Sequence, residues 1–548
     1  GDFTVEFRVF DDGAAYRFST VSKDSLRVID EIAEFNFAGD DSAYIPYSND
    51  PHNKDKFQCS FENTYRHIPL SQFVRDTVAF APVLVESSGA KVIITEADLE
   101  NYPGMFLTNT RNGNGLRGAF ARYALEQVQN ERNPVQALVT RRGDFIARTA
   151  GQRSFPWRVV IVAQNDRDLL NNDMVYRLAS PSRVADPSWI RPGKVAWDWW
   201  NDWNISHVNF KAGINTETYK YYVDFAAASH IDYILLDEGW SDDRDIMKVT
   251  PAIDLPGIIS YAATKHVGVW LWMGSFPLDE KMKQIFDTYP AMGVKGFKID
   301  FMDRDDQNMV EFYYKVAKAA ADHHIMIDFH GAYKPTGLQR TYPNVVNVEG
   351  VHGMEQLKWS NPDMPAFDVS IPFIRMVAGP MDYTPGAMRN ATKESFRPVN
   401  SMPMSQGTRC HQLAMYVMYE APFEMLSDNP TAYMNEKECL DFISSVPTTF
   451  SRTVAVNGRI GQYAVIARRK SDTWYVAAMT NWNARDLSID LSFLPPGRYS
   501  MDGFQDGINA DRDATDYSRR QVTIDAGEKV NIHLAPGGGW AAKISPAK

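Results

Sequence analysis

Acidic side chains gather at the end of one apolar segment, GVKGFKIDFMDRDDQ, which spans residues 293–307. Its first nine residues predict a buried strand, and four aspartates end or follow it: Asp300, Asp303, Asp305 and Asp306. Lys298 precedes Asp300 by two residues, so both side chains project from the same side of the strand. A carboxylate at the carboxyl end of a barrel strand is a typical nucleophile or general base, which makes Asp300 a candidate catalytic residue.

Further carboxylates and tryptophans follow other apolar runs. These residues are Asp237, Glu238, Glu349, Glu355 and Asp382, with Trp199, Trp200, Trp240, Trp270 and Trp272. Glycoside hydrolysis needs two carboxylates that flank an oxocarbenium-like transition state. For any single acid, a solvated rim or a salt-bridged cap explains the residue equally well. The whole set, placed at consecutive strand ends beside tryptophans, favours a sugar-hydrolysing site.

The segment VNVEGVHGMEQLKW carries Glu349 and Glu355 six residues apart, with two glycines that permit tight turns between them. Clusters of hard oxygen ligands also bind Ca²⁺. DRDDQNMVEF lacks the glycine that an EF-hand loop requires at its sixth position, so any calcium site must be assembled from distant segments. His323 and His324 precede an expected strand that His330 ends, so joint zinc ligation is not expected. The chain contains no GxSxG, P-loop, HExxH or strand-linked GxGxxG motif.

Composition excludes several protein classes. The chain has 548 residues, of which 44% are hydrophobic and 23% charged, which indicates a globular protein of roughly two to four domains. Its net charge of -11 and lack of a basic stripe argue against nucleic acid as a partner. It has no apolar run of ~18 residues that could span a bilayer. Cys59, Cys410 and Cys439 are expected to be free buried thiols. Because the chain begins with Gly1, we expect a processed or trimmed sequence whose compartment cannot be read directly.

The elements that must position these residues fall into three regions. Short alternating runs predict an N-terminal β-sandwich over residues 1–180, and similar runs predict a C-terminal β-sandwich over 447–548. Apolar runs alternate with amphipathic segments over 181–446, which predicts a central (β/α)8 TIM barrel. The eight expected barrel strands are 193–200, 232–240, 266–274, 294–302, 324–331, 344–350, 368–375 and 421–426.

The chain resembles glycoside hydrolase family 97 over essentially its whole length. The segments that carry the resemblance are ITEADLENYPGM, GKVAWDWWNDWN, YILLDEGWS, GFKIDFMDRDDQ, FHGAYKPTGLQRTYPNVVNVEGVHGMEQ and GPMDYTPGAM. The resemblance implies a calcium-dependent α-glycosidase with an N-terminal β-supersandwich, a (β/α)8 barrel and a C-terminal β-domain. The N-terminal domain is shorter than the family implies, so we expect that leading strands are missing from the sequence.

The resemblance also implies roles for particular residues. Inverting members carry a base glutamate in a His-Glu pair at the end of strand five, where this chain has His330 and Gly331. Retaining members place a nucleophilic aspartate on strand four, at the position of Asp300. Glu355 matches the proton donor and Glu349 a calcium ligand. The expected metal ligands are Glu96 (with Glu100 as its competitor), Glu349 and Glu355, and the expected substrate-binding residues are Trp199, Asp237, Trp240, Lys298 and His330.

These residues lead us to expect a calcium-dependent, retaining exo-α-galactosidase that acts on α-linked oligosaccharides. Asp300 must stay ionised in order to attack, which the nearby ammonium of Lys298 favours, and Glu355 must be protonated first and deprotonated later. The alternatives are an α-glucosidase of the same family and a non-catalytic carbohydrate-binding protein. We expect a monomer, and the resemblance implies a periplasmic or secreted location.

Overall fold

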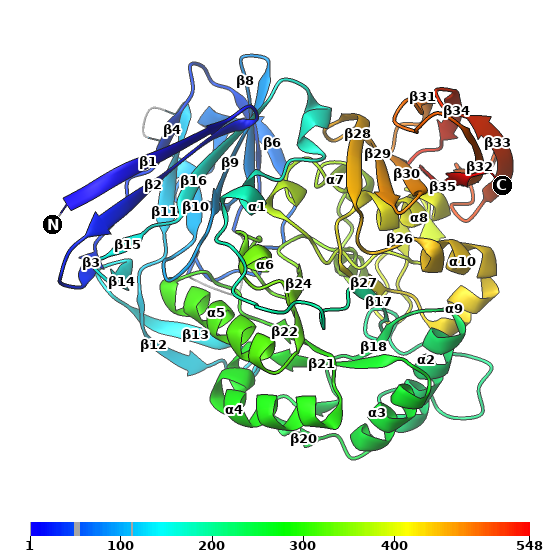
Figure 1. The fold of residues 1–548 in the computed structure, drawn as a ribbon, viewed down its shortest axis with the longest axis horizontal. Coiled ribbons are helices and arrows are strands. Elements are labelled where there is room, and N and C mark those ends of the chain that lie inside the picture. The colour runs from blue at the N-terminus through cyan, green and yellow to red at the C-terminus, as the bar shows by residue number, and fades with distance from the viewer. Residues whose placement is uncertain (1, 49–54, 111–112, 548) are drawn as a thin grey trace.

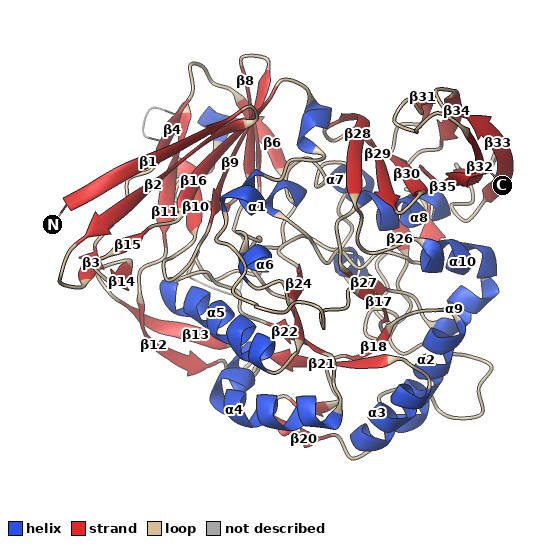
Figure 2. Cartoon of the chain, in the orientation of Figure 1, coloured by secondary structure: helices blue, strands red, loops and turns tan. Residues whose placement is uncertain are grey.

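The computed structural model describes residues 2–48, 55–110 and 113–547. Three regions follow one another along the chain: an N-terminal β-domain, a central region in which strands alternate with helices, and a C-terminal β-domain (Figure 1). Figure 2 shows that the helices gather around the central region, whereas the two flanking regions consist mostly of strands. This arrangement confirms the predicted fold class.

The N-terminal domain contains two larger antiparallel sheets, as its period-two sequence patterns predict. In the first, the spatial order is β1 (Asp2–Phe10), β2 (Gly13–Val21), β16 (Trp157–Ala163), β9 (Ala90–Ala97), β8 (Val83–Ser87), β5 (Ser42–Ile45) and β6 (Arg66–Pro69), and β15 (Arg153–Ser154) pairs with β2. The second has the order β4 (Glu34–Asn36), β11 (Gly115–Phe120), β10 (Met105–Asn109) and β7 (Ala79–Phe80). Two small pairs complete it: β12 (Ala124–Gln129) with β13 (Ala137–Arg142), and β3 (Leu26–Val28) with β14 (Ala147–Thr149).

A seven-stranded parallel sheet forms the centre of the molecule. Its spatial order is β24 (Val345–Val348), β23 (Met326–Phe329), β22 (Gly296–Asp300), β21 (Gly268–Gly274), β18 (Tyr233–Leu236), β17 (Gly193–Ala196) and β27 (Phe423–Leu426). The larger helices between these strands are α2 (Thr216–Ala228), α3 (Leu255–Thr264), α4 (Ser275–Met292), α5 (Gln307–Asp322) and α8 (Arg409–Met418). Because the strands are parallel, their carboxyl ends meet on one side of the barrel.

The expected strand at residues 368–375 does not form, and this prediction was wrong. Helix α7 (Met364–Asp368) and a series of turns occupy that part of the chain, and Pro372 in the middle of the run removes a ladder donor. The gap between β24 and β27 is instead bridged by a later segment. The amide of Asp382 donates to the carbonyl of Val348 at 3.2 Å, and that of Met381 donates to Glu420 at 2.9 Å. This segment carries Asp382 to the carboxyl side of the barrel.

Short elements lie between the larger ones. They are α1 (Met174–Leu178), α6 (Leu338–Thr341), α9 (Pro430–Asn435), α10 (Lys437–Ser445), the 3₁₀ turns η1 (Leu70–Gln72), η2 (Asp166–Leu169), η3 (Met354–Lys358) and η4 (Met376–Ala378), and the two-stranded pairs β19 (Ser241–Asp242) with β20 (Asp245–Val249) and β25 (Asn390–Ala391) with β26 (Ser405–Gln406). No helix in the described ranges is both long and apolar enough to cross a membrane.

The C-terminal domain is a six-stranded antiparallel sheet beside one smaller strand pair. The order in the sheet is β28 (Arg452–Arg459), β29 (Tyr463–Lys470), β30 (Thr473–Thr480), β35 (Gly539–Pro546), β32 (Arg498–Asp506) and β33 (Tyr517–Asp525), and the pair is β31 (Arg485–Asp490) with β34 (Lys529–Leu534). Helix α8 of the barrel packs closely against β35. The approach is so close that a Cβ built on Gly539 of β35 would come within 2.5 Å of the carbonyl oxygen of Cys410 in α8.

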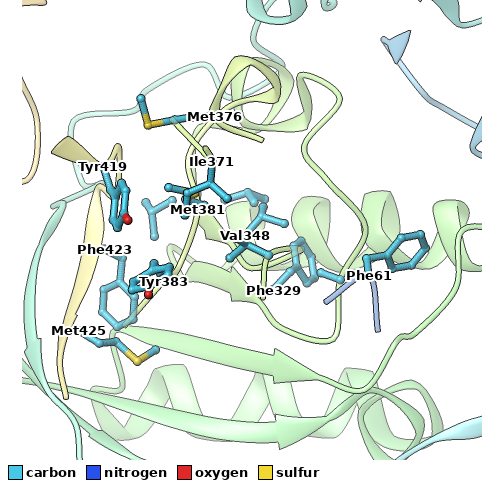
Figure 3. Packing of buried hydrophobic residues seen from close by; sticks show 14 of the residues in the cluster. Phe61, Phe329, Val348, Ile371, Met376, Met381, Tyr383, Tyr419, Phe423 and Met425 are labelled. Atoms are coloured by element: carbon cyan, nitrogen blue, oxygen red, sulfur yellow. The ribbon is translucent and has the colours of Figure 1, made fainter. Parts of the chain in front are cut away.

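One continuous apolar core joins the barrel to the N-terminal domain. Figure 3 shows part of it, with Phe61 of the N-terminal domain at one end, beyond Phe329 of β23. The ring of Phe61 lies 6.4 Å from that of Tyr333, just after β23. The three cysteines are free and buried, as predicted. The segment that follows Phe61 is therefore fixed against the barrel by packing, and this places Glu62 near the barrel ends.

Candidate active site

Asp300 ends β22, where the chain turns sharply. Phe301 and Asp303 both have positive φ angles, 63° and 50°. The Asp300 carboxylate accepts a hydrogen bond from the backbone N–H of Phe301 at 2.7 Å and another from Nε1 of Trp272 at 3.1 Å. Two donors, one from β21 and one from the turn after β22, thus fix its orientation. Asp300 is half-buried, so one side of the carboxylate stays accessible.

Lys298 forms its direct ion pair with Asp237 rather than with Asp300. Its Nζ lies 3.0 Å from Oδ2 of Asp237 and 4.6 Å from the ring centroid of Trp197. Nε1 of Trp197 donates to the same carboxylate oxygen at 2.6 Å. All three side chains are buried. Burial opposes the ammonium form, but Asp237 and then Asp300 outweigh it and raise the pKa of Lys298. The floor of the site therefore holds a permanent positive charge beside Asp300.

His330 and Gly331 occupy the end of β23. His330 shares a 2.6 Å hydrogen bond with Asp382 and lies 3.4 Å from Glu349. Burial and the charge of Lys298 oppose protonation, but Asp328 and Asp382 outweigh them and raise the pKa of His330 to about 9. A charged imidazole here provides a fixed cation among buried carboxylates.

Gly331 has no room for a side chain. Its φ is 53°, and a Cβ at this position would meet Oδ1 of Asp303 at 2.7 Å and the backbone nitrogen of Phe301 at 2.8 Å. Its own amide donates to Oε2 of Glu349 at 2.7 Å. In this conformation residue 331 supplies a backbone N–H to the site and cannot supply a carboxylate.

Glu62, Glu349 and Glu355 lie near one another where β24 ends and η3 begins. Ligand atoms of His330, Glu349 and Glu355 lie within 4.8 Å of one another. Burial, followed by the charges of Glu62 and Glu355, raises the pKa of Glu349 well above its usual range. Burial and the charge of Glu355 do the same to the pKa of Glu62. Glu62 comes from the N-terminal domain, and its Oε2 accepts a 2.5 Å hydrogen bond from Gln356. Crowded carboxylates of this kind are the ligands that Ca²⁺ prefers, and a bound dication would relieve their repulsion.

The structure does not bring Glu96 to this cluster. Glu96 is fully buried in β9, where one oxygen accepts a 2.6 Å hydrogen bond from Arg158 and the other pairs with Lys334. Its competitor Glu100 lies on the surface and pairs with Arg183 at 2.6 Å. Sequence reasoning missed Glu62, because nothing in the surrounding SFENTY pattern distinguishes it from a surface acid.

The expected aromatic residues have different surroundings. Trp240 is fully buried, and its Nε1 donates to the backbone carbonyl of Trp272 at 2.6 Å. It therefore supports β21, whose Trp272 donates to Asp300, and presents no open face. Trp199 is half-buried and stacks on Trp197, with ring centroids 5.9 Å apart. Part of the Trp199 ring thus remains accessible to solvent.

The remaining acids of the opening segment hold the turn together. The amide of Asp303 donates to the carbonyl of Gly331 at 2.7 Å, and its own carbonyl accepts from Cys59 at 2.8 Å. Asp306 is buried beside Arg304 at 3.2 Å and caps α5 through the amide of Met309. These contacts secure the turn after Asp300 and leave Asp300 as the partly open acid at the strand end.

Glu355 is also partly open, as are Glu62 and Glu238. Burial raises its pKa, His330 and Lys298 act in the opposite direction, and the charge of Asp300 raises it further. Asp300 and Glu355 therefore lie within electrostatic reach of each other, one held by two N–H donors and the other biased toward its protonated form. This pairing suits a nucleophile and a proton donor.

Comparisons with known proteins give the family of the chain. Family profiles match three parts of the chain: Glycosyl-hydrolase 97 N-terminal over residues 1–181, Glycoside hydrolase 97 over 199–351, and Glycosyl-hydrolase 97 C-terminal, oligomerisation, over 449–545. The description of the third profile argues against the predicted monomer.

Curated relatives and solved structures extend over nearly the whole chain. It is 48% identical to a retaining alpha-galactosidase of Bacteroides thetaiotaomicron, over 99% of this chain and 83% of that protein. It is 29% identical to a probable retaining alpha-galactosidase of Streptomyces bingchenggensis, over 98% and 77%. A family 97 enzyme from Pseudoalteromonas sp. strain K8, solved in complex with acarbose, superposes with a TM-score of 0.86 at 26% identity, covering 100% of this chain and 86% of that one. The chain therefore belongs to glycoside hydrolase family 97 and is a glycoside hydrolase.

Proposed function

We propose that this enzyme is an exo-acting α-galactosidase that retains anomeric configuration, with Asp300 as nucleophile and Glu355 as general acid and base. The observation that carries the proposal is the pairing of two partly open carboxylates with a Gly331 that has no room for a base. The 48% identical relative described as a retaining alpha-galactosidase supports the choice of substrate.

The first step forms a covalent intermediate. A carboxylate oxygen of Asp300 attacks the anomeric carbon while the bond from that carbon to the leaving oxygen breaks. Glu355 gives its proton to the departing oxygen, so no alkoxide is released. The product is a β-linked galactosyl ester of Asp300. The N–H groups of Trp272 and Phe301 hold the carboxylate in the attacking orientation.

The second step reverses these roles. Glu355, now a carboxylate, takes a proton from water, and the water oxygen attacks the anomeric carbon. The ester bond breaks, Asp300 regains its negative charge, and galactose leaves as the α-anomer. Two inversions thus give net retention.

We further propose that Glu62, Glu349 and Glu355 hold Ca²⁺. The ion would supply positive charge that orients Glu355 or a sugar hydroxyl. Glu62 replaces Glu96 in this proposal, because both oxygens of Glu96 already pair with cations.

We also propose that the substrate meets Trp199, Asp237, Lys298 and His330, of which Lys298 and Asp237 form a buried ion pair. Trp240 would act only through the strand behind Asp300, since it is fully buried. We also propose a periplasmic or secreted location, and fractionation of the native host would test it.

Replacing Asp300 with Gly tests the nucleophile. We expect the turnover of p-nitrophenyl α-galactoside to fall by about 10⁴-fold or more. The two N–H donors would then face a space that azide can enter, so added azide should restore turnover and yield β-galactosyl azide. Asp243→Gly, at an exposed acid in the same barrel, is the matched control and should keep full activity without an azide effect.

Three outcomes would contradict the proposal. A fully active Asp300→Gly variant would remove Asp300 from the nucleophile role. A β-anomer as the first product in proton NMR of the unmodified enzyme would indicate inversion. Faster hydrolysis of the α-glucoside than of the α-galactoside would make the enzyme an α-glucosidase.

A further inference from the structure

A row of tryptophans leads from the floor of the site to the surface. Trp197 is fully buried and bonded to Asp237, Trp199 is half-buried, and Trp359 is 48% exposed. The ring of Trp199 stacks on that of Trp197 and meets Trp359 edge to face, with centroids 6.0 Å apart and planes at 81°. The row therefore forms a continuous aromatic wall whose outer end is open.

Trp359 is held in place by a polar contact to Gln356, which in turn contacts Glu62. It directly follows η3, the turn that carries Glu355. Its Nε1 donates to Oε1 of Gln356 at 3.1 Å, and Nε2 of Gln356 donates to Glu62 at 2.5 Å. The ring is thus held through its Nε1–H group, and its exposed part remains available to contact a ligand.

Lys358 fixes the neighbouring ring. Its Nζ donates to the carbonyl of Trp200 at 2.7 Å and lies 4.8 Å from the ring centroid of Trp199. A buried ammonium in this position holds the indole by a cation–π contact. The rings of Trp199 and Trp359 are therefore held at a fixed angle before any ligand binds, which lowers the entropy cost of ligand binding.

The position of this pair identifies its ligand. A leaving group departs on the side of the residue that protonates it, which is Glu355 in the proposed function. Pyranose rings have an apolar face of C–H groups, and an exposed indole offers apolar area at low conformational cost. Resting on that proposed function, we propose that Trp199 and Trp359 form the subsite for the leaving group, and that this group is a pyranose of an oligosaccharide.

Two substrates separate the subsite from the chemistry. Melibiose carries a glucose leaving group, whereas α-galactosyl fluoride carries none that could reach the wall. For Trp359→Ala we expect kcat/KM on melibiose to fall about tenfold, which corresponds to losing roughly 50 Å² of buried apolar surface. The same variant should hydrolyse α-galactosyl fluoride at the unmodified rate, which also shows that it is folded. Trp359→Phe should recover most of the melibiose rate.

Trp189→Ala is the matched control, because Trp189 stacks on His324 before β23, at the opposite end of the barrel. It should leave the ratio of the two rates unchanged. Unchanged melibiose hydrolysis by Trp359→Ala, or an equal loss on both substrates, would overturn the subsite. If the unmodified enzyme instead cleaves α-glucosyl fluoride, the galactosidase proposal fails, and the same comparison with maltose decides the subsite independently.

Discussion

The space around Gly331 allows a quantitative test of the retaining mechanism. An alanine at this position must adopt a φ of 53°, which costs about 1 kcal/mol for a residue with a Cβ. The Cβ would also lie 2.7 to 3.0 Å from atoms of Asp303 and Phe301, two of them backbone atoms that cannot rotate away. Overpacking of this kind typically costs ~1–3 kcal/mol. We therefore expect Gly331→Ala to destabilise the barrel by about 2–4 kcal/mol.

Gly293→Ala provides the matched control within the same barrel. Gly293 ends α4 with a φ of 104°, but its Cβ would meet only Cγ2 of Ile259 at an ordinary 3.4 Å. In this variant only the cost of the positive φ angle, about 1 kcal/mol, should be lost from the free energy of unfolding. Urea unfolding followed by tryptophan fluorescence measures both, and the difference between the two variants isolates the steric contribution.

The same reasoning predicts the stereochemistry of Gly331→Glu. A glutamate that cannot be accommodated cannot act as a base, so any remaining activity should still release the α-anomer. Equal stability of Gly331→Ala and Gly293→Ala would refute the steric argument. Release of the β-anomer by Gly331→Glu would refute the conclusion drawn from it.

Two further predictions concern the proton and the metal. Because burial raises the pKa of Glu355 and the first step needs its proton, kcat/KM on melibiose should fall as pH rises through that pKa. Fluoride leaves without a proton, so α-galactosyl fluoride should lack this alkaline decline, and an identical decline for both substrates would count against Glu355 as the acid. Removal of the proposed Ca²⁺ with a chelator should lower both activity and the urea midpoint, because Glu62 and Glu349 would then repel each other without a counter-ion. Glu349→Gln should show a weaker response to chelator, and an unchanged midpoint in the unmodified protein would exclude a stabilising ion.

The sequence predicted the barrel strands well where an apolar run was also a strand in the folded protein. The strand that ends at Asp300 is apolar, short and followed by acids, and it formed where expected. The run at 368–375 is equally apolar, but its burial comes from turns packed in the core, and apolarity alone does not separate these two cases.

The site residues divide in the same way. Asp300, Glu349 and Glu355 lie at or near strand ends, where position along the chain implies position in space. Glu62 meets Gln356 across 294 residues, and no local pattern reports such a contact. For Glu96 the sequence could not distinguish two roles, since a buried acid in a strand predicts a metal ligand and an ion-pair partner equally well.

The pairing of Glu96 with Lys334 has a consequence for engineering of this enzyme. Lys334 lies on the loop that follows His330 and Gly331, and its buried ammonium has its carboxylate partner in the N-terminal domain. A barrel produced by itself would lose the carboxylate partner of Lys334 and would lack Glu62 as well. We therefore expect that a transplanted barrel would need its own N-terminal domain to retain the geometry of its active site.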